Sequence, residues 1–121
     1  MTLNTMEPNP TWGADAYPEV VEAFSALEDD AVVRVWGADW CGDCRSQLPD
    51  FAAALEAAGV ENVEEYPVER VDGEKVGPKV EAYDVTLIPT IVIERDGEEV
   101  ARFIEEEPVS PEVYLAEQLS D

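Results

Sequence analysis

The sequence has no histidine, only two cysteines and few cations. Of its 121 residues, 29 are Asp or Glu and 7 are Lys or Arg, so the formal net charge is −22. Nucleic acids and anionic membrane surfaces are bound through clusters of Lys and Arg. We therefore expect the chain to bind neither. The acidic residues come in short groups among apolar residues, which is typical of a solvated acidic surface rather than a disordered tail.

The excess of negative charge also bears on the solvent in which the protein works. Salt screens the mutual repulsion of surface carboxylates, and the Debye length shrinks to roughly 3 Å at 1 M salt. We expect a protein adapted to high salt, from a halophile, and the alternative is an ordinary acidic protein of a low-salt cell. At low salt the same repulsion favours a monomer.

Long apolar runs are missing as well. The opening residues lack the basic flank and apolar stretch of a signal peptide, and no run is long enough to span a bilayer. We expect a cytoplasmic location, where a cysteine pair is more often catalytic or metal-binding than structural. The length and the apolar share of 45% suit one core. We expect a flexible lead-in over residues 1–17 and a single domain over residues 18–121.

Hydrophobic periodicity predicts an N-terminal helix followed by the order βαβαββα, which is an α/β fold. The expected turn of the closing hairpin is Asp96-Gly97, a pair that favours a tight turn between strands. In chain order, the expected elements are a helix at 18–30, a strand at 31–38, a helix at 44–59, a strand at 63–72, a short helix at 74–85, a hairpin at 90–105 and a helix at 110–119.

The two cysteines stand two residues apart in "CGDC", where the first expected strand ends and the next helix begins. A helix N-terminus stabilises a thiolate, so we expect Cys41 to be the nucleophile and Cys44 to attack the mixed disulfide formed on Cys41. This cycle needs no cofactor. One alternative is a pair of inert buried thiols. A zinc site is the other, and it would need two chains, because one chain offers two cysteines and no histidine.

Two motifs resemble the thioredoxin family. In "ADWCGDC", Trp40 directly precedes Cys41, and "LIPT", which ends at Thr90, is similar to the family's cis-proline loop. With the hairpin that follows, the resemblance runs over residues 20–119. It implies a thioredoxin fold, a central mixed β-sheet of about four strands flanked by helices. It also implies a thiol-disulfide oxidoreductase that reduces protein or small-molecule disulfides and is re-reduced by a disulfide reductase or a low-molecular-weight thiol.

The resemblance further implies roles for residues around the dithiol. Pro89 would be cis, Ile88 would offer backbone groups that bind a substrate chain as an added strand, and Trp40 would shape the nearby surface. The alternatives are an ordinary trans turn proline and an ordinary aromatic. The residues expected to bind substrate are Trp40, Gly42, Ile88, Pro89, Thr90 and Glu105.

Three positions depart from the family's pattern. Asp43 stands where a proline is usual; its carboxylate disfavours a thiolate on Cys41, although an acid at a helix N-terminus is also favourable in itself. Val35 occupies the place of a buried acid that takes the proton of the second thiol, which leaves Asp43, Asp39 or water for that task. Glu105 replaces a glycine beside the substrate groove and should narrow the range of partners.

A second kind of function stays open from the sequence. The groove at Pro89 would serve a polypeptide-binding or chaperone module, with a vestigial or regulatory dithiol. The presence of both cysteines favours the oxidoreductase, because binding alone does not need Cys44.

Overall fold

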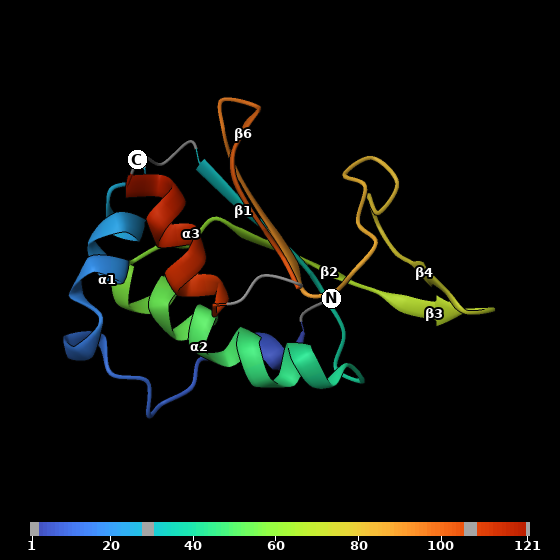
Figure 1. Cartoon of the computed structure of the whole chain (residues 1–121), viewed down its shortest axis with the longest axis horizontal. Coiled ribbons are helices and arrows are strands. Elements are labelled where there is room, and N and C mark those ends of the chain that lie inside the picture. Colours follow the sequence, from blue (N-terminus) through green and yellow to red (C-terminus); the bar gives the residue numbers. More distant parts are fainter. Residues whose placement is uncertain (1–2, 28–30, 106–108, 121) are drawn as a thin grey trace.

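A four-stranded mixed sheet forms the centre of the molecule (Figure 1). The computed structural model describes residues 3–27, 31–105 and 109–120. The strand order is β2-β1-β5-β6, with β1 parallel to β2 and the other neighbours antiparallel. The expected α/β fold with a mixed sheet is confirmed. The helices are α1 (Pro18–Ser25), α2 (Gly42–Ala58) and α3 (Pro111–Ser120), and the strands are β1 (Ala31–Gly37), β2 (Val63–Pro67), β3 (Glu69–Val71), β4 (Glu74–Val76), β5 (Thr90–Arg95) and β6 (Glu98–Ile104).

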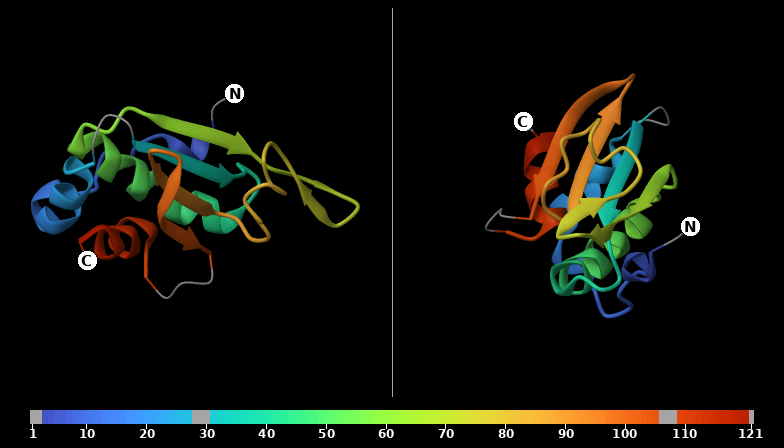
Figure 2. Two further views of the ribbon diagram at one scale, coloured as in Figure 1. Left: turned by 90° about the horizontal axis from the view of Figure 1, so that it is seen from above. Right: turned by 90° about the vertical axis from the view of Figure 1, so that its right-hand side faces the viewer.

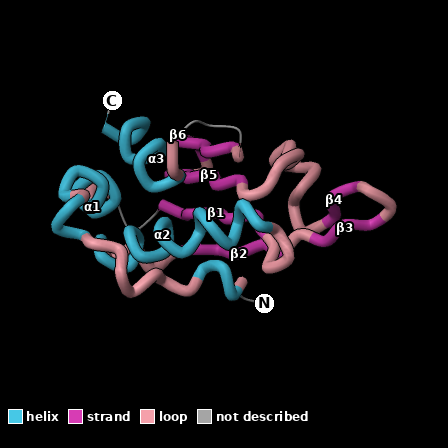
Figure 3. Tube along the Cα trace, turned by 60° about the horizontal axis from the view of Figure 1, so that its bottom comes forward, coloured by secondary structure: helices cyan, strands magenta, loops and turns pink. Residues whose placement is uncertain are grey.

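The three helices pack against one another and cover one face of the sheet (Figure 3). Val33 and Val35 of β1 are fully buried, and Phe24 of α1 meets Phe51 of α2 edge to face at 6.0 Å between ring centroids. Gly59, at φ 76°, ends α2 in the left-handed conformation that glycine adopts without strain. Among the described residues, no helix is both long and apolar enough to cross a membrane.

An aromatic and ionic cluster occupies the other face of β1. Trp36 is fully buried; its ring stacks on that of Tyr66 and meets that of Tyr83 at a tilt, with centroids 4.8 and 5.0 Å away. Arg34 lies on the same face, as the alternation of a strand requires, and its Nε donates to Glu94 Oε1 at 2.7 Å. Alternation along β1 thus places Trp36 and Arg34 on the face opposite to Val33 and Val35.

The helix expected over residues 74–85 is wrong. In its place, β3 and β4 form a hairpin, and turns continue to residue 84 (Figure 2). Asp72 and Gly73, with φ of 51° and 82°, form the turn of this hairpin. Inside the expected helix, Lys79 and Asp84 have φ of 60° and 55°, and a Cβ on Gly77 would lie 2.9 Å from the oxygen of Pro67. These backbone requirements break a helix. The strand predicted over residues 63–72 is likewise divided, into β2 and the first strand of this hairpin, β3.

Residues 3–17 contact the domain instead of forming the loose lead-in expected from the sequence. Leu3 is buried, and its N–H donates to Glu65 Oε1 at 2.6 Å. The N–H of Thr5 donates to Asp39 Oδ1 at 3.1 Å, and that of Asn9 donates to the oxygen of Pro49 at 3.0 Å. This segment thus contacts β2, α2 and the loop before α2. The boundary between residues 17 and 18 stays a prediction.

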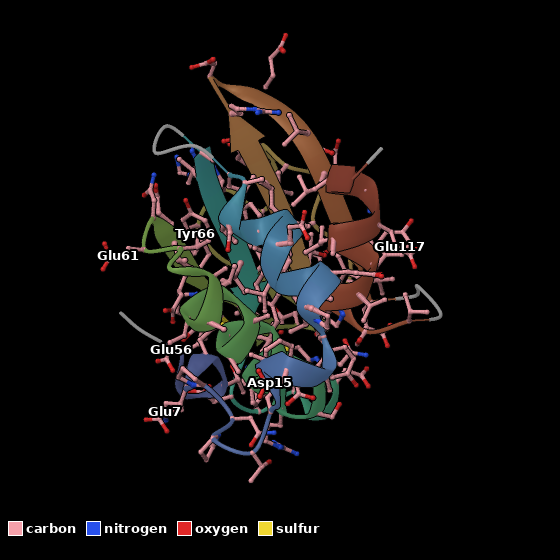
Figure 4. All side chains as sticks on the ribbon, turned by 90° about the vertical axis from the view of Figure 1, so that its left-hand side faces the viewer. Glu7, Asp15, Glu56, Glu61, Tyr66 and Glu117 are labelled. Carbon is pink, nitrogen blue, oxygen red and sulfur yellow. The ribbon has the colours of Figure 1, made fainter. Side chains whose placement is uncertain are left out.

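Acidic side chains project into solvent from most of the elements. Figure 4 looks at the end of the molecule away from the β3–β4 hairpin and shows exposed carboxylates around its rim. They include Glu7, Asp15, Glu56, Glu61 and Glu117. Their distribution matches the solvated acidic surface expected from the sequence.

Candidate active site

Cys41 caps the N-terminus of α2. Its backbone is extended, with φ −91° and ψ 121°, and its Sγ accepts a hydrogen bond from the N–H of Cys44 at 3.4 Å. The first N–H groups of a helix have no partner within the helix, so the sulfur occupies a place where negative charge is stabilised. Cys41 is half-buried and therefore reachable by another sulfur atom.

Cys44 lies behind Cys41 in the first turn of α2 and is completely buried. A Cβ on Gly37 would come within 3.4 Å of its Sγ, so the small residue at the end of β1 makes room for the thiol. Burial raises the pKa of Cys44, and its hydrogen bond with Cys41 raises that pKa further. Both cysteines are free thiols, which is the reduced form of the pair.

The loop before β5 contacts Cys41, although the two are far apart in the sequence. The peptide bond between Ile88 and Pro89 is cis, and the Sγ of Cys41 donates to the carbonyl of Ile88 at 3.8 Å. Ile88 and Thr90 are buried, and the hydroxyl of Thr90 donates to the oxygen of Leu87 at 2.6 Å. The structure thus brings together the two motifs on which the thioredoxin resemblance depends.

Trp40 lies at the surface beside the nucleophile. Its side chain is 44% exposed, and its indole N–H donates to the oxygen of Val68 at 3.1 Å. The guanidinium of Arg70, in β3, lies 4.9 Å from the centroid of the indole ring. Arg70 was missed at the sequence level, because neither spacing nor periodicity relates a residue of β3 to the cysteine loop.

The other expected residues lie at the same end of the sheet. Gly42 and Asp43 begin α2, and the charge of Asp43 adds slightly to the raised pKa of Cys44. Glu105 directly follows Ile104, which pairs with Thr90. Substrate binding by Gly42 and Glu105 and the supporting role of Asp43 at the thiols stay predictions.

Within β1, all of whose residues the structure describes, no acid stands on the helix-facing side near Cys44. Val35 is fully buried two residues before Gly37, on the same face of the strand. Asp39 uses one carboxylate oxygen to accept the N–H of Thr5. In the described part of the chain, no three His, Cys, Asp or Glu side chains are grouped to hold a metal ion.

The model of the Thioredoxin family matches residues 13–115, which is most of the chain. The chain belongs to the thioredoxin family. The thioredoxin of Chlamydia pneumoniae is 33% identical over 84 residues, which cover 69% of this chain and 78% of that relative. The X-ray structure of Fasciola hepatica thioredoxin, 26% identical, superposes with a TM-score of 0.56 over 88% of this chain and 90% of that one. A mutant thioredoxin from Halobacterium salinarum, at 24% identity, shares the fold with a TM-score of 0.55, over 99% of this chain and 94% of that one.

Membership in the thioredoxin family indicates which chemistry the cysteine pair carries out. Together, the relatives and the adjacent thiols of Cys41 and Cys44 support thiol-disulfide oxidoreductase activity. Membership in the family suggests disulfides as substrates and a reductase as electron donor.

Proposed function

We propose that the protein is a disulfide reductase in which Cys41 attacks the substrate and Cys44 releases it. The observation that carries this assignment is the difference in exposure between the two thiols. Cys41 is partly exposed at the N-terminus of α2, whereas Cys44 is buried behind Cys41. A substrate sulfur can therefore meet Cys41 first, and only an intramolecular attack involves Cys44.

The reaction balances over two exchange steps. The Cys41 thiolate attacks one sulfur of the substrate disulfide, the S–S bond breaks, and the departing thiolate takes a proton from water. The Cys44 thiolate then attacks Cys41 Sγ, so the second substrate thiolate leaves and the Cys41–Cys44 disulfide forms. Two electrons pass to the substrate, and a disulfide reductase or a low-molecular-weight thiol returns them to the protein.

The loop at Pro89 completes the proposed site. The carbonyl of Ile88 accepts from Cys41 in the reduced protein, so it marks the place where a substrate backbone would pair beside the nucleophile. Trp40 and Gly42 are the chain neighbours of Cys41, Thr90 directly follows Pro89, and all three are proposed to contact substrate. The cytoplasmic location, the monomeric state and the adaptation to high salt stay predictions from the sequence.

Reduction of insulin disulfides tests the proposed activity. We expect the wild-type protein to accelerate reduction by dithiothreitol by about tenfold or more, and Cys41→Ser to give no acceleration, because a hydroxyl does not exchange with disulfides. Thermal melting checks that the variant is folded. A wild-type rate equal to that of dithiothreitol alone would leave the polypeptide-binding module as the better account.

A further inference from the structure

The cations of this acidic chain are unevenly placed. Among the described residues, three ion pairs form, and they involve only Arg34 and Arg102. Arg95 ends β5 at the far end of the sheet from Cys41. Arg45 and Arg70 lie next to the cysteine loop and, like Arg95, pair with no described carboxylate. The site end of the molecule therefore carries cations whose charge is not neutralised by a neighbour.

Arg70 is held in a defined position over an exposed aromatic side chain. The indole of Trp40 is fixed by its hydrogen bond to Val68, and the guanidinium of Arg70 lies 4.9 Å from the ring centroid. A guanidinium stacked on an aromatic face keeps its N–H groups directed outward at its rim. Those N–H groups match the two oxygens of a carboxylate. An acid of a bound partner would thus meet Arg70 beside Trp40, the residue that directly precedes the nucleophile.

Two further cations extend this surface. Lys75 stands opposite Arg70 in the β3–β4 pairing, so both side chains lie on the same face of the hairpin. Glu69 and Glu74 alternate with them and lie on the other face. Arg45 donates to the backbone oxygen of Asp39 at 3.0 Å.

Arg45 also lies close to the residue that follows Cys41. A Cβ on Gly42 would lie 4.0 Å from Nη2 of Arg45. Trp40 and Gly42, the two neighbours of the nucleophile in the chain, are thus each accompanied by a guanidinium. The exposed carboxylate of Asp43 is the opposing charge in the first turn of α2.

We propose that Arg70, with Lys75 and Arg45, binds carboxylate side chains that flank the disulfide of an acidic polypeptide substrate. This inference rests on the proposed function and names the class of substrate for the same site. A chain with a net charge of −22 repels acidic partners. Because charges beyond about 8 Å are screened at physiological salt, the local cations decide whether an acidic segment reaches Cys41.

Two peptide disulfides of equal length test the substrate class. One carries Asp and Glu around its cysteines, and the other carries Asn and Gln at the same positions. Calorimetric titration of a Cys41→Ser/Cys44→Ser background measures binding without exchange, and kcat/KM of the intact dithiol protein measures reduction, both in 0.15 M and 2 M KCl. We expect the acidic peptide to bind about five- to tenfold more tightly at 0.15 M and this preference to shrink at 2 M.

Substitutions of Arg70 test whether this residue causes the preference for the acidic peptide. Arg70→Gln should weaken binding of the acidic peptide about three- to fivefold and leave the neutral peptide unchanged, whereas Arg70→Lys should lose less. Arg95→Gln removes an equal charge from the far end of the sheet and is the matched control. Equal binding of both peptides, or equal effects of Arg70→Gln and Arg95→Gln, would overturn the inference. If binding follows the expected pattern and neither peptide is reduced, the proposed function fails while the carboxylate-binding surface stands.

Discussion

Replacing Cys44 by serine is expected to stop turnover and leave the substrate attached to Cys41. Cys41 still attacks the first disulfide, but the hydroxyl at position 44 has no means of displacing it. We expect turnover to fall about a hundredfold or more, as it does when one member of a two-step catalytic pair is removed. Mass spectrometry after mixing with a peptide disulfide should show one stoichiometric adduct on Cys41.

Two controls make this trapping experiment specific. Cys44 is fully enclosed, so a serine hydroxyl there costs about 1–3 kcal/mol of stability, and Cys44→Ala avoids burying a polar group. Both variants should trap the same adduct. Cys41→Ser should trap none, because Cys44 is not exposed to substrate. An adduct on Cys44, or full turnover in Cys44→Ala, would contradict the assigned order of attack.

The second exchange step is expected to accelerate steeply with pH. Burial raises the pKa of Cys44, and burial persists when Cys41 is in the mixed disulfide. A raised pKa keeps the thiol protonated at pH 7, so the reactive thiolate fraction grows about tenfold for each pH unit until the pH reaches the pKa. The rate of release should therefore rise about a hundredfold between pH 7 and pH 9. Stopped-flow mixing with a chromogenic aryl disulfide separates this step as the second phase of colour.

Position 35 tests the cause of the slow release that we expect at neutral pH. Val35→Asp places a carboxylate on the helix side of β1, where it would accept the proton of Cys44, and we expect a faster second phase at pH 7 with a flatter pH profile. Val35→Asn has the same shape and no basic group, so it controls for the cost of a buried polar side chain. A second phase that is fast and independent of pH in the wild type would show that another group already takes the proton.

The site was largely predictable from the sequence because its parts are marked by local motifs. A strand followed by a helix fixes Cys41 at a helix N-terminus, and the step at Pro89 is recognisable in four letters. The contact between Cys41 and Ile88 joins these two motifs in space. It can be inferred once the sheet order is known, because β1 and β5 are neighbours. Arg70, which lies over Trp40, could not be found in this way, because its position depends on the β3–β4 hairpin, whose direction no local pattern specifies.

The missed hairpin shows where the periodicity argument failed. Residues 74–85 have apolar spacing compatible with a helix, yet Gly77 and Pro78 interrupt it near its start. The available signal was Asp72-Gly73, the same pair that correctly predicts the turn at Asp96-Gly97. Leu3 was missed for a different reason: a single apolar residue in a polar segment carries no periodicity, and its burial depends on the space beside Gly37.

A redox titration of the Cys41–Cys44 pair tests the central claim most directly. The protein is equilibrated with thiol and disulfide buffers of graded potential, in low and molar KCl, and its free thiols are trapped and counted by mass. We predict one reversible two-electron transition between the dithiol and an intramolecular disulfide, near the value of about −270 mV that is typical of a thioredoxin reductant. Failure of the two thiols to form an intramolecular disulfide at any potential would contradict it.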